Sequence, residues 1–388
     1  MCRQCLGAGG LFAGLASTAQ TLDPSADKAL SSAPNGQRFA RPAIDTEEGG
    51  LWALMDREER RLRRSPFVVR DAALHQYVHE LACRLTASHC PDIRVHIVRT
   101  PLFNASMAPN GMMQIWSGLL LRVENEAQLS AVVGHELGHY LERHTLERLR
   151  DAKSRAAFAQ FVGLFGAVGS LVQLGVLAGA FAFSREQEMR ADTLGVRMMQ
   201  RAGYEGQQAA RVWDNLLGEL KIRGGDDAGK SNPMTATHPP TETRRDDLLR
   251  LAGEGAGETG QQAFEQIIQP HRFDWLRDEI KRGQFEESMV LFNRMLKGKP
   301  NDSELLYSRG ETQRLRAGEQ DLQGALNDLQ RVTVMDRAPA EAFRSLGLLQ
   351  RQRADRPSAV QAFETYLKVA PDAADASLIQ HILSELKS

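Results

Sequence analysis

The stretch "GHELGHYLERH" at residues 134–144 places three histidines close together. His135 and His139 are four residues apart, so on an α-helix their rings lie about 40° apart around the axis and reach one ion. Glu136 projects to the same side, where it can hold a water molecule. This H-E-x-x-H pattern is typical of hydrolases in which two histidines bind zinc and the glutamate is the general base. It predicts one Zn2+ per chain.

The third histidine of the stretch, His144, is a weaker candidate ligand. An unbroken helix would point its ring away from an ion held by the other two. A metzincin-type site needs a glycine that turns the chain and a histidine ten residues after the first. Here those two positions hold Glu142 and Thr145. We therefore predict that His144 packs or makes a helix-end hydrogen bond and does not bind zinc.

The segment "SREQEMRAD" at residues 184–192 offers the third ligand. Glu188 and Asp192 lie one turn apart on a predicted helix. Glu188 can face the metal while Asp192 accepts the free N–H of a ligand histidine. Glu186 is the alternative ligand, although Arg190 four residues later indicates a salt bridge for it.

Together, "HELGH" and "SREQEMRAD" resemble the gluzincin metallopeptidases that include the CAAX prenyl proteases and the HtpX heat-shock protease. The resemblance is closest to the soluble periplasmic BepA-like peptidases, which add a C-terminal tetratricopeptide (TPR) region. It extends to "NASMAPNG" at 104–111 and "ATHPPTETR" at 236–244, and covers roughly residues 45–250.

This resemblance implies that Glu188 is the third ligand and that Asp192 orients a ligand histidine. It also implies that His238 and Arg244 lie in the active-site loop with catalytic roles, His238 either binding the open zinc position or stabilising the oxyanion. One departure concerns the acidic pattern, because Arg190 stands where the family has a second acidic residue.

The predicted fold is mainly α with a small β-sheet (α+β), a zincin-like peptidase domain followed by an all-α repeat domain. "DIRVHIV" at 92–98 alternates apolar and polar residues like a half-buried strand, and "MMQIW" at 112–116 is a second short strand. We expect the edge of this second strand, at Met113, Gln114 and Ile115, to bind an extended substrate peptide.

Residues 156–183 carry no charge and are long enough to span a membrane. A single span, however, would put Glu188 about 30 Å from the two histidines, on the other side of the membrane. We therefore predict an apolar helical hairpin that returns to the side it left. It is either buried in the protein or in peripheral contact with a membrane.

The N-terminus favours export. Residues 1–19 have the features of a signal peptide, and 20–44 of a flexible lead. Cleavage would leave Cys83 and Cys90, which an oxidising compartment would join in a disulfide, the alternative being two free thiols. These features predict the periplasm. The net charge of −1 gives no reason to expect nucleic-acid binding.

The remaining boundaries follow from composition. We expect the zinc metallopeptidase domain at 45–252, a linker at 253–270 and a TPR-like repeat domain at 271–388. Similar small-aromatic-proline patterns recur there at spacings of 37 and 34 residues. A generic helical bundle is the alternative. Stacked helix pairs present a concave surface, so this region is expected to dock proteins.

The function predicted from these features is a zinc metalloendopeptidase that cleaves unfolded or misassembled envelope proteins, with Glu136 as general base. An envelope protein would be the partner of the TPR surface. One rival is a TPR-based chaperone or assembly factor whose zinc site is mostly closed. A second rival is a different zinc hydrolase, such as an esterase.

Overall fold

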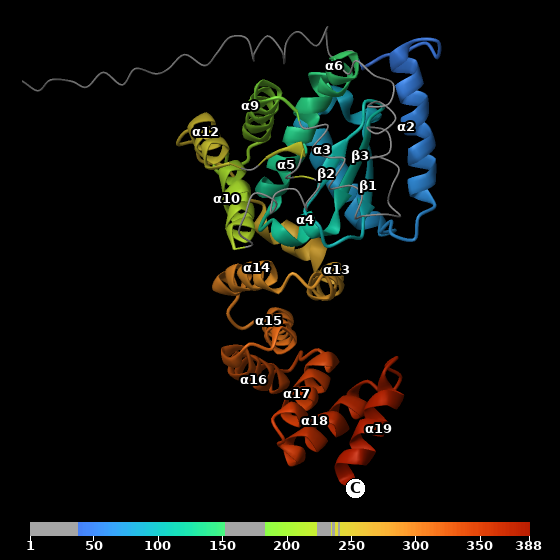
Figure 1. Ribbon diagram of the computed structural model, residues 1–388. Helices are drawn as coiled ribbons and strands as arrows, with labels where there is room; N and C mark the ends of the chain where they lie inside the picture. The colour runs from blue at the N-terminus through green and yellow to red at the C-terminus, as the bar shows by residue number, and fades with distance from the viewer. Residues whose placement is uncertain (1–37, 152–182, 223–233, 235–236, 240) are drawn as a thin grey trace, which may run out of the picture.

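The computed structural model describes residues 38–151, 183–222, 234, 237–239 and 241–388. Figure 1 shows a sheet surrounded by helices, from which a stack of further helices extends to the C-terminus. The predicted signal peptide, most of the predicted lead and all but the last residue of the predicted hairpin lie outside the described residues. None of the helices in the described part has the length and hydropathy that a membrane crossing needs.

The first group of elements is mainly helical with one small sheet, as predicted. In chain order it contains α2 (Glu47–Arg63), α3 (Ala72–Thr86), the 3-10 turn η2 (Ala87–Asp92), β1 (Arg94–Val98), β2 (Ala105–Met107), β3 (Met112–Trp116), α4 (Ser117–Arg122), α5 (Glu126–Leu141), α6 (His144–Asp151), α9 (Arg185–Arg201), α10 (Gln208–Lys221) and α12 (Glu242–Ala252).

The sheet has the strand order β1-β3-β2, with β1 parallel and β2 antiparallel to β3. Successive side chains of a strand point to opposite faces. Met112 and Trp116 accordingly join one core cluster with Leu51 of α2, while Met113 and Ile115 join the main core with α3 and α5. Although both faces are covered, β1 still alternates, because Arg94 and His96 on the α2 side pair with the buried Glu59 at 2.6 and 3.0 Å.

The predicted peptide-binding edge at Met113, Gln114 and Ile115 is wrong. These residues form the middle of β3, which is hydrogen-bonded on both sides, to β1 and to β2. Met113 and Ile115 have no exposed surface. The sequence did not predict β2, because its three residues are too few to show alternation. Within the described sheet, β2 is the edge strand next to β3, and its outer edge is unpaired.

Small residues bring α5 and α9 into close contact. A Cβ atom added to Gly138 would lie 2.8 Å from the carbonyl oxygen of Ala191, and one added to Gly134 would lie 3.1 Å from Gly195. A larger side chain at either glycine would therefore force the helices apart. This contact matters for function because α5 carries the H-E-x-x-H pattern and α9 carries Glu188.

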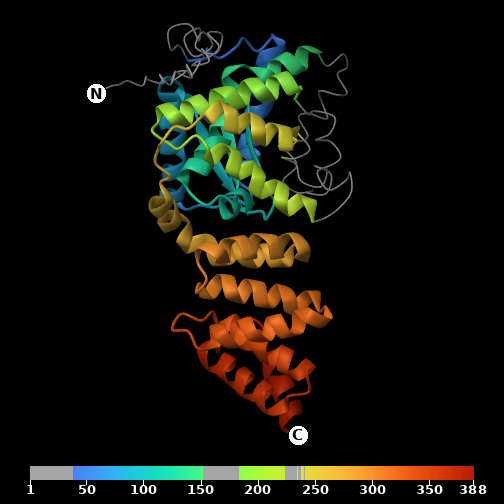
Figure 2. The same cartoon turned by 90° about the vertical axis from the view of Figure 1, so that its left-hand side faces the viewer.

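The C-terminal helices are stacked one after another, which Figures 1 and 2 both show. They are α13 (Gln261–Lys281), α14 (Phe285–Gly298), α15 (Ser303–Arg316), α16 (Glu319–Thr333), α17 (Ala340–Gln352), α18 (Arg356–Val369) and α19 (Ala376–Lys387).

Consecutive helices of this stack pack against each other, as helix-pair repeats require. A Cβ on Gly347 of α17 would lie 2.6 Å from the ring of Phe363 in α18, so the glycine admits the ring. The first helix begins at Gln261, inside the predicted linker 253–270. Assignment of the repeats to the TPR class remains a prediction.

A buried ion network joins the stack to the sheet-containing part. Arg122, at the end of α4, lies 2.7 Å from Glu219 of α10 and 2.9 Å from Glu279 of α13. All three side chains are at most 4% exposed. Arg294 of α14 contacts Glu219 at 3.0 Å. The charges are thus paired across the junction between the two groups of helices.

Cys83 of α3 and Cys90 of η2 are joined by a disulfide bond, with their Cα atoms 4.6 Å apart. The bond ties the end of α3 to the turn that enters β1. It lies outside the cluster of potential metal ligands formed by α5 and α9.

Candidate metal centre

Helix α5 positions the H-E-x-x-H residues in the interior. Its N-terminus is capped by Asn125, whose side-chain oxygen accepts the backbone N–H of Gln128 at 2.8 Å. His135, Glu136 and His139 are each at most 3% exposed. The two histidine Nε2 atoms lie 3.1 Å apart, so both face one point.

Helix α9 brings a carboxylate to that point. The capping box of Ser184 and Gln187 begins the helix, and Glu188 follows in its first turn. One Glu188 oxygen lies 3.3 Å from Nε2 of His139, and the other lies 3.6 Å from Nε2 of His135. Glu186, the alternative ligand, is exposed and is not part of this cluster.

His238 is the fourth member of the cluster. It precedes α12, and its Nδ1 lies 2.7 Å from Glu188 and 3.1 Å from Nε2 of His135. Its Nε2 lies 3.8 Å from Glu136. The structure thus brings His238 to the predicted ligands, within reach of both the metal position and the predicted base.

The donor set fits zinc. His135, His139, Glu188 and His238 each offer one ligand atom, and these atoms all lie within 4.8 Å of one another. Three imidazole nitrogens and one carboxylate oxygen, all buried, are the ligands that Zn2+ takes in tetrahedral sites.

Asp192 and Arg244 lie behind the ligands. Asp192 accepts from Nδ1 of His135 at 2.8 Å, which leaves Nε2 free to bind metal. Arg244 donates two hydrogen bonds of 2.8 Å to Asp192 and stacks at 3.9 Å on Trp213. Burial alone would raise the pKa of Asp192, but Arg244 and His135 outweigh it and lower that pKa to about 2.

Arg244 contacts the acidic side chains around His135, and the catalytic role that the sequence suggested for it stays a prediction. Its guanidinium is held by Asp192 and lies 3.1 Å from the Glu188 carboxylate. It is also buried, at 7% exposure. Arg244 thus contacts two acidic side chains that both lie close to His135.

Glu136 lies beside the cluster and, like the ligand candidate Glu188, has one carboxylate oxygen that makes no hydrogen bond with the described residues. Among the described residues, its Oε1 has no hydrogen-bond partner although it is fully buried. Burial raises the pKa of Glu136 above the ordinary value of a glutamate. A carboxylate with a raised pKa is a stronger base, as proton abstraction from water requires.

The structure gives His144 a position that the sequence did not reveal. Helix α5 ends at Leu141, and Arg143 adopts a left-handed conformation with φ of 57°. The chain therefore turns, and Nδ1 of the buried His144 comes to lie 2.9 Å from Nδ1 of His139. His144 is outside the ligand cluster, as predicted, but it contacts a ligand through the nitrogen that faces away from the metal.

Arg190 disfavours the protonation state of His144 that would let His144 accept a hydrogen bond from His139. A histidine that binds zinc through Nε2 carries its proton on Nδ1 and donates it to a neighbour, here Nδ1 of His144. His144 must then carry its own proton on Nε2. Burial, followed by Arg190, lowers the pKa of His144 to about 4, so the ring has only one proton near neutral pH. Yet Nε2 lies 2.9 Å from Arg190, which can only donate.

Replacing Arg190 with glutamate is expected to tighten zinc binding by about tenfold, the lower end of the effect of such neighbours on metal affinity. A glutamate would accept the Nε2 proton of His144 and so favour the tautomer that supports His139. Competition with a fluorescent zinc chelator measures the affinity. Arg185→Glu is the control, because it makes the same charge change at an exposed position of α9. Equal effects of the two variants would show that net charge alone is responsible.

Comparison with known proteins places these residues in a family. Residues 69–252 match the model of peptidase family M48. Over 212 residues the chain is 27% identical to the beta-barrel assembly-enhancing protease of Escherichia coli (strain K12), a match that covers 50% of this chain and 42% of that protein. The corresponding protein of Yersinia pestis is 28% identical over 235 residues, covering 55% of this chain and 47% of its own length.

A third relative is a mitochondrial metalloendopeptidase OMA1, from Arabidopsis thaliana. It is 31% identical over 159 residues, covering 40% of this chain and 31% of the relative. The chain thus matches less than half the length of each of these relatives. The clustered ligands and Glu136 all lie inside the range of the family match, so residues 69–252 form a domain of peptidase family M48, whose metallopeptidases use zinc.

Proposed function

We propose that this chain is a zinc-dependent metalloendopeptidase that cleaves unfolded or misassembled envelope proteins. The observation that carries the proposal is the buried carboxylate of Glu136, whose Oε1 makes no hydrogen bond with any described residue and lies 3.8 Å from His238, directly beside a cluster of metal-binding side chains. A purely structural zinc site has no need of such a group. Its free Oε1 is where the proton of an attacking water would go.

The chain's own residues divide the chemistry between them. His135, His139 and Glu188 would hold the ion, and Asp192 keeps His135 in the correct tautomer. A bound zinc ion supplies a Lewis acid that polarises the scissile carbonyl and makes water more acidic. Glu136 accepts a proton from the attacking water and later donates it to the leaving amine.

The free edge of β2 is the proposed site for the substrate backbone. On either side of β2, the carbonyl of Asn104 accepts the N–H of Trp116 at 3.0 Å, and the N–H of Ala108 donates to the carbonyl of Met112 at 2.8 Å. Because the pattern alternates along an antiparallel pair, the N–H and C=O groups of Ala105 and Met107 face outward. An extended peptide can pair with these groups irrespective of its sequence, which suits unfolded chains.

The proposed substrates and compartment rest on the relatives and on the N-terminal sequence. Two of the relatives are named for enhancing the assembly of beta-barrels. The signal-like N-terminus and the Cys83–Cys90 disulfide agree with the periplasm. In this proposal the stacked helices α13–α19 select an envelope protein and hold it near the peptidase domain.

Removal of zinc tests the enzymatic part of the proposal. Phenanthroline is expected to abolish cleavage of an unfolded protein such as casein, and added Zn2+ to restore it, because the three ligands and the base act only with the ion in place. Gel electrophoresis of the casein digest measures the rate. Full cleavage in the presence of the chelator, with zinc loss verified by atomic emission, would exclude a zinc peptidase.

A second function is favoured by the position of His238. As a fourth ligand it would occupy the position that substrate needs, and the chain would act mainly as a chaperone or assembly factor with a closed zinc site.

His238→Ala distinguishes the two functions. If His238 closes the site, the variant is expected to bind zinc about tenfold more weakly and to cleave casein faster than the wild type. If His238 instead stabilises the oxyanion, the variant should keep its zinc affinity and cleave more slowly. Chelator competition and the casein assay give the two measurements.

A further inference from the structure

A second group of potential metal ligands lies at the end of α3. Two groups of at least three such side chains, found among the described residues, bring their ligand atoms within 4.8 Å of one another. One is the cluster that contains His135, and the other consists of His79, Cys83 and Cys90. The two groups share no residue. They also differ in chemistry, because only the second contains sulfur.

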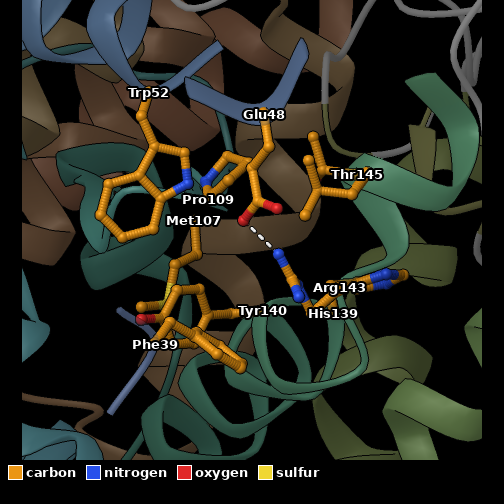
Figure 3. Close-up of a pocket in the computed structure, with 10 residues that line it drawn as sticks. Phe39, Glu48, Trp52, Met107, Pro109, His139, Tyr140, Arg143 and Thr145 are labelled. Atoms are coloured by element: carbon orange, nitrogen blue, oxygen red, sulfur yellow. Dashed lines mark hydrogen bonds and ion pairs between the residues drawn. The ribbon is translucent and has the colours of Figure 1, made fainter. Parts of the chain in front are cut away.

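The pocket beside His139 does not offer a comparable group. Figure 3 shows the side chains that line it, of which only Glu48 and His139 carry a carboxylate or an imidazole. Glu48 forms an ion pair with Arg143, and His139 already belongs to the first cluster. The group at the end of α3 is therefore the better candidate for a second metal site.

Helix periodicity and the turn after α3 bring the three side chains together. His79 and Cys83 are four residues apart on α3, so they lie on the same face of the helix. The turn η2 then returns Cys90 to Cys83, to which it is bonded. The Cys83 sulfur lies 3.7 Å from both ring nitrogens of His79. Because the ring torsion of histidine is soft, a rotation suffices to aim either nitrogen at an ion beside that sulfur.

His79 has no other structural task in the described part of the chain. Its neighbour one turn earlier, His75, directs one ring nitrogen at the carbonyl oxygen of Val95, at 3.2 Å, and the other at that of Val69, at 2.6 Å. His79 contacts only the Cys83 sulfur in this way, and a sulfur atom is a weak hydrogen-bond acceptor. A metal ion would therefore compete with no strong hydrogen bond of His79.

The surroundings allow both a reductant and a cation to reach the group. His79, Cys83 and Cys90 are all partly exposed. The adjacent cation, Arg84, is paired with Glu126 at 3.0 Å. Two thiolates and one neutral imidazole carry a total charge of −2, which balances a divalent ion. This ligand set suits Zn2+ and leaves one position of a tetrahedron for water.

We propose that His79, Cys83 and Cys90 form a redox-gated site for Zn2+, which is closed while the disulfide is present and opens when the disulfide is reduced. A dithiol transfers two electrons and two protons to the S–S bond and itself becomes a disulfide, which leaves two thiols on the chain. Binding of the ion releases those two protons to water and forms two zinc–sulfur bonds.

The ion takes over the structural role of the disulfide. The S–S bond ties the end of α3 to the turn that enters β1, and an ion bound to the same two sulfurs ties the same two elements. The attachment of β1 to α3 is then maintained under oxidising and under reducing conditions. Because the first cluster contains no cysteine, the redox state changes the number of ions bound per chain without changing the ligands of the peptidase centre.

Cobalt binding by the full chain tests the site. Cys2 and Cys5 are replaced by serine in every protein, so that only Cys83 and Cys90 carry thiols. Co2+ bound to thiolate has a charge-transfer absorption in the near ultraviolet, to which the cluster containing His135 cannot contribute. The chain reduced with a phosphine is expected to bind one more Co2+ than the oxidised chain and to gain this absorption. Equal Co2+ binding by the two forms, without the absorption, overturns the proposal.

His79→Ala shows whether the histidine is a ligand. In the reduced chain it should weaken Co2+ binding at the thiolate site by about tenfold or more, since a direct ligand contributes at least as much as a residue that orients one. His381→Ala is the matched control, because His381 lies on α19 with 71% of its side chain exposed and should leave the affinity unchanged. Equal affinities of His79→Ala and the control reject the three-ligand site.

Circular dichroism separates loss of binding from loss of folding. Where the reduced, metal-free chain loses part of its helical spectrum, Zn2+ is expected to restore it, because the ion replaces the missing S–S tie. A spectrum that stays altered after addition of Zn2+ contradicts the proposal. Diamide, which reoxidises the two thiols, should then release the second Zn2+ to a fluorescent chelator. Retention of that ion after the disulfide has formed again would also contradict it.

Discussion

Replacing Glu136 with glutamine is expected to lower the rate of peptide cleavage by about 10²–10⁴-fold while zinc remains bound, which is the range of effect for a general base. Glutamine has nearly the same shape but cannot accept the proton of the attacking water. The ligands should be undisturbed, because the clustered donors come from His135, His139, Glu188 and His238. Casein cleavage and zinc content by atomic emission measure the two properties.

Glu186→Gln is the matched control for this variant. It makes the same chemical change at an exposed position of α9, two residues from the ligand Glu188, and should leave both cleavage and zinc content as in the wild type. A Glu136→Gln variant that cleaves at the wild-type rate would rule out the glutamate as base. A variant that loses zinc would instead place Glu136 among the ligands.

A pull-down with the Glu136→Gln variant extends the argument to substrates. An enzyme that binds peptides but does not cleave them should retain its substrates long enough for their identification. If the cellular function survives the substitution, cleavage is not the main activity, and the closed-site function with His238 as fourth ligand becomes the better explanation.

The metal site was accessible from sequence to the extent that it depends on local geometry. His135 and His139 share a helix face by periodicity alone, and the capping box before Glu188 indicates where α9 begins. The position of His144 was not accessible, because it follows from the left-handed backbone of Arg143. Arginine carries no signal for that conformation, whereas a glycine there would have indicated it.

In the fold, too, local features could be predicted from the sequence and tertiary features could not. The mainly helical character and the strands at 92–98 and 112–116 could be predicted from hydropathy patterns, and β1 and β3 lie within those ranges. The order of the strands could not. It depends on β2, a strand of three residues whose pairing with β3 is set by tertiary contacts rather than by its own sequence.

Ion pairs between residues far apart in the chain could not be predicted from the sequence either. The buried network around Arg122 leads to a prediction for stability. Arg122→Leu is expected to lower the free energy of unfolding by about 3–5 kcal/mol, the usual cost of removing one member of a buried ion pair. The substitution leaves Glu219 and Glu279 buried without the guanidinium that joins them. Urea unfolding followed by circular dichroism measures the change.

Two comparisons separate this effect from a general loss of packing. Arg99 also links the sheet-containing part to α13, through Asp278 at 2.6 Å, but its side chain is 42% exposed. Arg99→Leu should therefore cost about 1 kcal/mol or less. Adding Glu219→Gln and Glu279→Gln to Arg122→Leu should recover part of the stability, because it removes two buried charges that have lost their shared partner, although Arg294 still lies 3.0 Å from position 219 and Arg282 lies 2.8 Å from position 279. If the triple variant is no more stable than Arg122→Leu, lost packing and not buried charge explains the cost. The junction between the peptidase domain and the helical stack would then depend on apolar contact instead of on paired charges.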